Sequence, residues 1–243
     1  MPPKEAAARV GVRHRGGSGI AIEEVEKVAG KVYNYITMPK WPWLITGALT
    51  SYIAYVNIPT SWMKKPESTT LEWLSAAQLE RISDPSETVQ AKTLYEKHGG
   101  LFMAVRRPGC LLCRKEAQSL SNINANVGAK KIPLYGILHE KEGAEQFKEF
   151  FKGDLFYDPE KRFFGPEERR MSLSGLFRAT VWKNVYDAKK GGFSGNLKGD
   201  GTLLGGVYLI GPGDTGILYE HKEMEFGDSH NETELMDVIA KMK

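Results

Sequence analysis

The chain has 243 residues, of which 41% are hydrophobic and 26% are charged. These proportions exclude wholesale disorder, a collagen-like repeat and a coiled coil. Lys and Arg exceed Asp and Glu by 33 to 30, and the whole excess lies in residues 1–40, because residues 41–243 hold 26 residues of each sign. A nucleic-acid-binding protein usually has a larger and more clustered basic excess. We therefore expect no nucleic-acid partner.

Residues 1–40 are predicted to form a basic N-terminal arm with a short amphipathic helix. Three arginines between residues 9 and 15 precede a glycine-rich stretch, and Val25, Val28 and Val32 have helical spacing. Arginine-rich, acid-poor arms are typical of mitochondrial targeting sequences, and a plain disordered tail is the alternative.

Residues 41–63 contain no charged residue, and tryptophans lie near both ends of this run. About 20 apolar residues span a bilayer, and Trp belongs at its interfaces. Thr, Ser and Asn dilute the run and Pro59 shortens any helix, so a hairpin of core helices in a soluble protein is the alternative. We predict a single transmembrane helix, and we favour the mitochondrial inner membrane over the cytoplasm as the location.

Residues 64–98 are predicted to be a helical connector, with helices over 71–82 and 86–99. Residues 99–243 then alternate between strand and helix patterns. Strands are expected at 101–105, 132–138 and 154–158, helices at 110–123, 143–151, 167–188 and 231–243, and a hairpin at 205–211 and 216–222. This α/β order predicts a thioredoxin-like domain with helical insertions before the hairpin.

The two cysteines of the chain, Cys110 and Cys113, are spaced as C-x-x-C directly after a predicted strand. Cys110 would begin a helix, where unpaired N–H groups and the helix dipole favour a thiolate. Five Lys or Arg residues and no carboxylate lie between Lys97 and Lys115, which favours the thiolate further. Cys110 is therefore the expected nucleophile, and Cys113 is placed to resolve a mixed disulfide or sulfenic acid.

Four residues before the pair are expected to support the thiolate: Arg106, Arg107, Pro108 and Gly109. One alternative is a buried structural cysteine pair, although burial of Cys110 is not expected directly after a Pro-Gly turn. Half of a zinc site is the other alternative, but the five histidines lack the usual ligand spacing. We expect no metal and no cofactor.

Several separated blocks resemble the peroxiredoxin-like 2 family, which includes redox-regulatory proteins of the PAMM type, selenoprotein U and prostamide/prostaglandin F synthase. The blocks are RRPGCLLCRKEA (106–117), FKGDLFYDPEKRFFGPEERR (151–170), GGFSGNLKGDG (191–201) and ILYEHKEMEFGD (217–228). The resemblance covers about 66–243 and implies a thioredoxin-like fold with thiol redox activity. It also places Cys110 where selenoprotein U has its selenocysteine.

The sequence departs from the wider peroxiredoxin pattern in two respects. Cys110 occupies the Thr position and Arg106 the Pro position of P-x-x-x-[TS]-x-x-C. No proline lies between Pro166 and Pro212, so the cis-proline that usually faces a thioredoxin C-x-x-C is missing, and Gly205 and Gly206 stand there instead.

Three further features receive structural interpretations. The glycine-rich loop 191–201 is expected to lie tightly over the site rather than to wrap an anion. The acidic and histidine residues between His221 and His230 have the composition of a metal site, but alternating charge on a hairpin edge explains them. Trp182 and Tyr186 are expected to be core or membrane-facing.

The function that these features favour is a membrane-anchored, peroxiredoxin-like thiol–disulfide redox protein that uses Cys110 and Cys113, with a thiol reductant such as thioredoxin or glutathione as partner. The alternative is an accessory subunit of a mitochondrial membrane complex of the respiratory-chain type, held through residues 1–65, in which the redox chemistry is vestigial.

Overall fold

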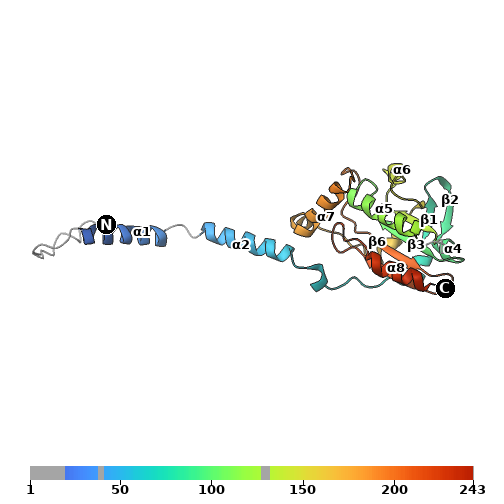
Figure 1. Ribbon diagram of the computed structural model, residues 1–243, viewed down its shortest axis with the longest axis horizontal. Coiled ribbons are helices and arrows are strands. Elements are labelled where there is room, and N and C mark those ends of the chain that lie inside the picture. Colours follow the sequence, from blue (N-terminus) through green and yellow to red (C-terminus); the bar gives the residue numbers. More distant parts are fainter. Residues whose placement is uncertain (1–19, 38–40, 127–131, 243) are drawn as a thin grey trace, which may run out of the picture. The chain divides into compact units, whose positions relative to one another are not determined.

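The computed structural model describes residues 20–37, 41–126 and 132–242 (Figure 1). It divides after Ser51 into an N-terminal unit and a larger unit, Tyr52–Lys243. The first 19 residues of the predicted basic arm, with all of its arginines, lie outside the described residues.

Two helices occupy the N-terminal part of the chain. Helix α1 (Ile20–Thr37) contains the predicted amphipathic helix, and α2 (Trp41–Val56) has 16 residues. At 1.5 Å per residue α2 is about 24 Å long, whereas the hydrocarbon core of a bilayer is about 30 Å thick.

The chain leaves α2 at Asn57, whose side chain donates to the carbonyl of Ile53 at 2.9 Å. Pro59 and a 3₁₀ turn at Thr60–Trp62 follow. Within the described ranges, no helix has both the length and the apolar character that crossing a membrane requires. The predicted transmembrane helix over 41–63 is therefore wrong, because the helix ends seven residues before the uncharged run does.

The larger unit is built on one seven-stranded sheet with the order β2-β1-β5-β4-β3-β6-β7. The central strands β3, β4 and β5 are parallel, and β6, β7, β1 and β2 are antiparallel to their neighbours. Their bounds are Gln78–Arg81 (β1), Asp84–Gln90 (β2), Gly100–Val105 (β3), Leu134–Leu138 (β4), Asp154–Tyr157 (β5), Gly206–Ile210 (β6) and Ile217–Lys222 (β7).

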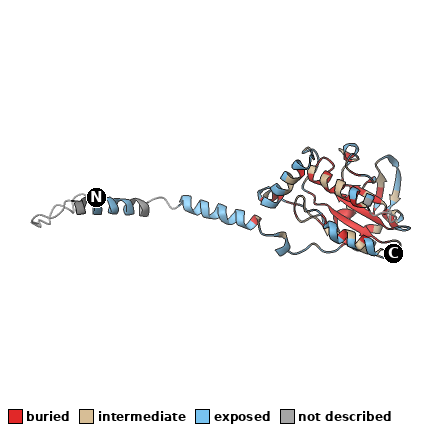
Figure 2. Ribbon diagram, in the orientation of Figure 1, coloured by how far each residue is buried: buried red, intermediate tan, exposed pale blue. Residues whose placement is uncertain are grey.

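Every residue of β3 is buried, because helices cover both faces of the sheet (Figure 2). Leu101, Met103 and Val105 point to the core under α5 (Leu111–Asn126), α6 (Ala144–Phe147) and α8 (Glu232–Lys241). Phe102 and Ala104 point to the other face. That face is covered by α3 (Leu71–Ser75), α4 (Ala91–Tyr95) and a 3₁₀ turn at Arg162–Phe164.

The order β3–α5–β4 followed by the β6–β7 hairpin and α8 is that of a mixed α/β, thioredoxin-like fold. The predicted fold class is confirmed for this part. The expected C-terminal helix is also present, and Asn231 caps it by accepting from the N–H of Glu234 at 3.2 Å.

Three predicted helices are wrong in extent. The helix expected over 86–99 is only α4, Ala91–Tyr95, because β2 occupies the first part of that range. The helix expected over 71–82 ends at Ser75, and residues 78–90 instead form the β1–β2 hairpin, which joins the sheet through β5. The helix expected over 167–188 is replaced by a 3₁₀ segment at Leu173–Phe177 and α7 (Ala179–Lys190). Residues 165–168 form a turn, and Arg170 makes an isolated antiparallel bridge to Leu203.

Candidate active site

The cysteine pair lies where the carboxyl end of β3 meets the start of α5. Pro108 and Gly109 form the turn between them, and the N–H of Cys110 donates to the carbonyl of Arg107 at 3.1 Å. The N–H of Arg114 in turn donates to the carbonyl of Cys110 at 3.0 Å, so Cys110 is the residue that caps the helix. Cys113 lies one turn further along α5.

Both thiols are reduced and buried. Cys110 is 5% exposed and Cys113 is 2% exposed. The expectation that a Pro-Gly turn would keep Cys110 at the surface is therefore wrong. The glycine-rich loop after α7 covers the turn, as its sequence had suggested.

Several hydrogen bonds hold this loop, residues 191–201, over the site. The N–H of Asn196 donates to the carbonyl of Gly109 at 2.7 Å, Arg107 Nη2 donates to the carbonyl of Asn196 at 2.7 Å, and Arg114 Nη1 donates to the carbonyl of Ser194 at 2.9 Å. A Cβ on Gly195 would lie 2.6 Å from both the carbonyl oxygen of Gly109 and the N–H of Leu111. Only glycine fits there, since such a distance is too short for any Cβ.

Arg106 is the basic residue that contacts the thiol. Its Nη2 donates to Cys110 Sγ at 2.9 Å, and its guanidinium lies 4.5 Å from the centre of the Phe226 ring. Arg106 Nη1 also donates to the carbonyl of Gly201 in the loop at 3.2 Å, and Arg107 and Arg114 donate to other loop carbonyls. Of the four residues expected to support the thiolate, the structure thus brings the side chain of Arg106 to the sulfur and uses Arg107, Pro108 and Gly109 to shape the turn and hold the loop.

The two thiols have opposite acidities. A hydrogen bond from Cys113, outweighing the opposing effect of burial, together with the charge of Arg106 holds the pKa of Cys110 well below its usual value. The same hydrogen bond, together with burial, raises the pKa of Cys113 well above its usual value. The arrangement therefore favours the thiolate at Cys110 over a thiolate at Cys113.

Glu223 is a buried carboxyl group that the sequence did not single out for this site. It follows β7, and its Oε2 accepts from the N–H of Gly205 at 2.9 Å and lies 3.7 Å from Arg106 Nε. Burial raises the pKa of Glu223 to about 7, even though Arg106 and the Gly205 N–H act to lower it. Cys113 and Glu223 both line one small cavity.

Sheet topology explains why these residues meet. Strands β3 and β4 are parallel neighbours, so their carboxyl ends lie at the same edge of the sheet. Arg106 follows β3 and His139 follows β4, and His139 Nε2 donates to the carbonyl of Arg106 at 2.6 Å. In the antiparallel hairpin, Gly205 precedes β6 and Glu223 follows β7 at the same edge. Only the pairing of the strands could have revealed the role of Glu223, because it lies 113 positions from Cys110 in the chain.

The acidic and histidine side chains between His221 and His230 do not converge on one point, because they bind different partners. Glu225 pairs with Arg178, and His230 Nδ1 lies 2.6 Å from Glu116 Oε1. Within the described part of the chain, no group of three such side chains could hold a metal ion. No cis peptide bond occurs in that part of the chain either. The N–H of Gly205 donates to Glu223, which lines the same small cavity as Cys113.

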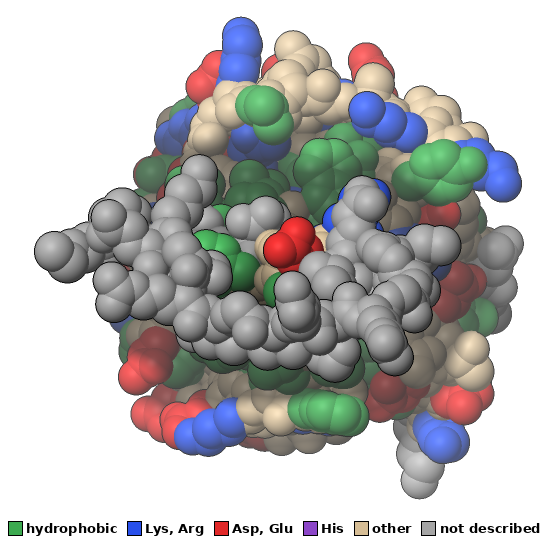
Figure 3. All heavy atoms as spheres, turned by 90° about the vertical axis from the view of Figure 1, so that its left-hand side faces the viewer, with side chains coloured by type: hydrophobic (Ala, Val, Ile, Leu, Met, Phe, Trp, Pro, Cys, Tyr) green, Lys and Arg blue, Asp and Glu red, His purple; other side chains and the backbone are tan. Residues whose placement is uncertain are grey.

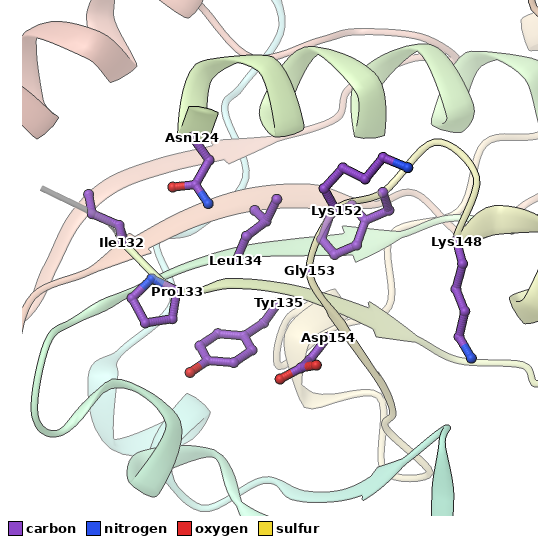
Figure 4. A pocket seen from close by; sticks show the side chains of 10 residues that line it. Asn124, Ile132, Pro133, Leu134, Tyr135, Lys148, Lys152, Gly153 and Asp154 are labelled. Atoms are coloured by element: carbon purple, nitrogen blue, oxygen red, sulfur yellow. The ribbon is translucent and has the colours of Figure 1, made fainter. Parts of the chain in front are cut away.

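A separate hollow lies at the start of β4 and the end of α5 (Figure 4). Leu134, Tyr135, Lys152 and Asp154 are among its lining residues, and no cysteine is. This hollow is at the amino end of β4, whereas the cysteines are at the carboxyl end of the parallel β3. We therefore place the chemistry at the cysteine pair.

Several known proteins are similar to this chain in sequence. The family model described as AhpC/TSA antioxidant enzyme matches residues 119–225, a range that begins after both cysteines. Peroxiredoxin-like 2A of Gallus gallus is 41% identical over 215 residues, which cover 87% of this chain and 96% of the relative. Peroxiredoxin-like 2A of Homo sapiens is 39% identical over 216 residues, 86% of this chain and 93% of the relative.

Among solved structures, a yeast mitochondrial 1-Cys peroxiredoxin studied for its thiol-resolving mechanism superimposes with a TM-score of 0.42 and 15% identity. The match covers 73% of this chain and 76% of that chain. A peroxiredoxin-like protein from Aquifex aeolicus gives a TM-score of 0.43 with 12% identity, over 68% of this chain and 82% of that chain.

Proposed function

Because the chain belongs to the family of peroxiredoxin-like 2A proteins, we propose that it is a thiol redox enzyme in which Cys110 reduces a peroxide and Cys113 resolves the product. The observation that carries this proposal is the hydrogen bond of 2.9 Å from Arg106 Nη2 to Cys110 Sγ. It stabilises a thiolate, which is the reactive form of cysteine.

The first step uses the thiolate of Cys110. Its sulfur attacks the terminal oxygen of a hydroperoxide, the O–O bond breaks, and Cys110 becomes a sulfenic acid. The alkoxide that leaves takes a proton from water and departs as an alcohol. The peroxide is reduced by two electrons and the sulfur is oxidised by two, so the step balances.

The second step joins the two cysteines. Cys113 Sγ attacks the sulfur of the sulfenic acid and the S–O bond breaks. The hydroxide that leaves takes the proton of the Cys113 thiol and departs as water. The two residues are one helical turn apart and already hydrogen bonded, so a disulfide between them requires only a local rearrangement at the start of α5.

Burial of the pair favours a small oxidant over a protein disulfide. With Cys110 only 5% exposed under the loop at 191–201, a peroxide needs a much smaller opening than an attacking protein chain does. An external reductant must then return two electrons and two protons to the disulfide. The dithiol thioredoxin or two molecules of the monothiol glutathione, the partners predicted from the sequence, would supply them.

Steady-state turnover tests the proposal. The wild-type protein, Cys110→Ser and Cys113→Ser are supplied with hydrogen peroxide and the monothiol glutathione, and peroxide consumption is followed. We expect the wild type to consume peroxide, Cys110→Ser to fall to the uncatalysed rate, and Cys113→Ser to accumulate mixed disulfides with the reductant. Equal rates for the wild type and Cys110→Ser would contradict the proposal.

The alternative role as an accessory subunit of a mitochondrial membrane complex, held through residues 1–65, stays a prediction of the sequence. It is separable from the redox proposal, since replacing both cysteines by serine changes little volume and would leave such an assembly intact.

A further inference from the structure

A continuous set of large apolar side chains is exposed on the larger unit, away from the cysteine pair. We call it the aromatic surface. Its members come from the chain around the end of α2 and from the 3₁₀ segment and α7, and each is between 43% and 81% exposed. They are Tyr52, Tyr55, Trp62, Leu173, Leu176, Phe177, Trp182 and Tyr186.

Polar contacts, of which those of Arg178 are wholly or partly buried, hold the two segments of this surface together. Arg178, which is 8% exposed, donates to the carbonyl of Val56 at 2.6 Å and to that of Ile58 at 3.0 Å, and it also pairs with Glu225. The side chain of Asn57 donates to the carbonyl of Phe177 at 3.0 Å and accepts from the N–H of Ala179 at 2.8 Å. The aromatic surface is therefore a built feature, because positions about 120 residues apart in the chain are fixed to one another.

The two segments that form the surface carry mostly basic charge. Residues 52–65 and 172–190 contain five exposed lysines and a single acidic residue, Asp187, which pairs with Lys183 at 2.8 Å. On α7, Trp182, Tyr186 and Lys189 have helical spacing along the outer face, while Val181 and Ala188 are buried on the inner face. Hydrophobic side chains lie beside Lys and Arg side chains on the face drawn in Figure 3, and Asp and Glu side chains lie along its edges. The exposed lysines are Lys64, Lys65, Lys183, Lys189 and Lys190.

We propose that the aromatic surface lies on the headgroup region of an anionic lipid bilayer. Tyr and Trp have an apolar body and a polar edge that suit this region. Lysines beside them extend their ammonium groups toward anionic headgroups while their methylene chains cover apolar area. This mode places the protein on the bilayer and needs no spanning helix.

The same charges argue against a second copy of the chain as the occupant. In a two-fold symmetric dimer the same patch faces itself, so the five lysines of one copy would meet the five of the other. Like charges brought together across an interface oppose association. An anionic bilayer instead complements all of them at once.

Vesicle co-sedimentation of the full chain tests the proposal. One set of vesicles contains only phosphatidylcholine, and the other adds phosphatidylserine. We expect binding to the second set, weakened by added salt. The triple variant Trp62→Ser, Phe177→Ser, Tyr186→Ser and the triple variant Lys183→Gln, Lys189→Gln, Lys190→Gln should each partition at least about tenfold more weakly.

The matched control is Leu197→Ser, which removes a side chain that is 91% exposed but lies in the glycine-rich loop outside the surface. It should bind as the wild type does, and the thermal unfolding midpoint of each variant checks its folding. Wild-type binding by both triple variants would overturn the proposal and assign the binding to α2 or the N-terminal arm. Salt-insensitive binding to pure phosphatidylcholine, no vesicle binding, or a wild-type dimer that the aromatic triple variant abolishes would also overturn it.

Discussion

Arg106 Nη2 donates a hydrogen bond to Cys110 Sγ at 2.9 Å, while Nε of the same side chain lies 3.7 Å from the carboxylate of Glu223. The buried guanidinium of Arg106 therefore contacts two groups that can each carry a negative charge, the thiol of Cys110 and the carboxyl group of Glu223. Since the charge of Arg106 helps to lower the pKa of Cys110, and the charge of Cys110 helps to raise the pKa of Glu223, the protonation states of the two groups are linked.

Removing the cation should make the thiol less reactive. Arg106→Gln keeps a side chain that can donate a hydrogen bond but loses the charge, so the pKa of Cys110 should rise toward its ordinary value. We expect alkylation by iodoacetamide at pH 7 to slow by about tenfold or more, with the midpoint of the rate–pH curve moved upward. Arg107→Gln is the matched control, because Arg107 donates to the carbonyl of Asn196. Equal slowing in both variants would show that the loop, and not the charge at the sulfur, controls reactivity.

Removing the competing carboxyl group should have the opposite effect on the thiol. Glu223→Gln is close to isosteric and leaves Arg106 with the thiolate as its only nearby negative partner at this site. The midpoint of Cys110 alkylation should then move to lower pH than in the wild type. An unchanged midpoint would mean that Glu223 and Cys110 titrate independently.

Glu223 should also make stability depend on pH. Its pKa is raised from 4.5 to about 7 by burial, so between these values the folded state binds more protons than the unfolded state. The stabilisation from the protonated carboxyl is present in full below pH 4.5 and is lost as the pH rises through about 7. We expect the free energy of unfolding of the wild type, relative to Glu223→Gln, to fall by about 3 kcal/mol across this range. Parallel curves for the two proteins, from urea titrations at each pH, would contradict this assignment.

The loop over the site provides a prediction about access. Gly195→Ala places a methyl group 2.6 Å from backbone atoms of the turn, and this contact can be relieved only by moving the loop. We expect destabilisation of about 1–3 kcal/mol and faster alkylation of Cys110. At Gly201, which lies in the same loop, a Cβ would be 3.5 Å from the side chain of Arg107. Gly201→Ala should therefore behave like the wild type, and slower alkylation in Gly195→Ala would show that the loop does not restrict access.

Local patterns were sufficient to predict the strands and helices that frame the cysteines. The apolar run at 101–105, the helix after Cys110 and the glycine-rich turn between β6 and β7 are each short-range signals, and the structure has all three elements. The β1–β2 hairpin was mistaken for helix because β2 is largely exposed and lacks a buried alternating face. Its strand conformation depends on β1, which in turn pairs with β5 far along the chain.

The residue at which α2 ends and the contact of Glu223 with Arg106 depend on long-range contacts, which cannot be predicted from local composition. The uncharged run predicted a helix to residue 63, but Arg178 takes up the carbonyls of Val56 and Ile58 and fixes the exit of the chain at that point. The sequence pattern explained Glu223 as one of the alternating charges on a hairpin edge. It lies near Arg106 because it follows β7 of the β6–β7 hairpin, and β6 pairs with β3 directly before Arg106. Trp182 and Tyr186, expected in the core or facing a membrane, are exposed on α7.

The most direct test of the redox account is the fate of the two thiols after a single equivalent of hydrogen peroxide, without reductant. The reduced wild-type protein is oxidised and digested with trypsin, and the fragment that holds both cysteines is weighed by mass spectrometry. The account predicts that this fragment loses two hydrogen atoms in the wild type. It further predicts a sulfenic acid at Cys110 in Cys113→Ser and an unmodified Cys113 in Cys110→Ser. Oxidation of Cys113 in the absence of Cys110, or two unmodified thiols in the wild type, would contradict it.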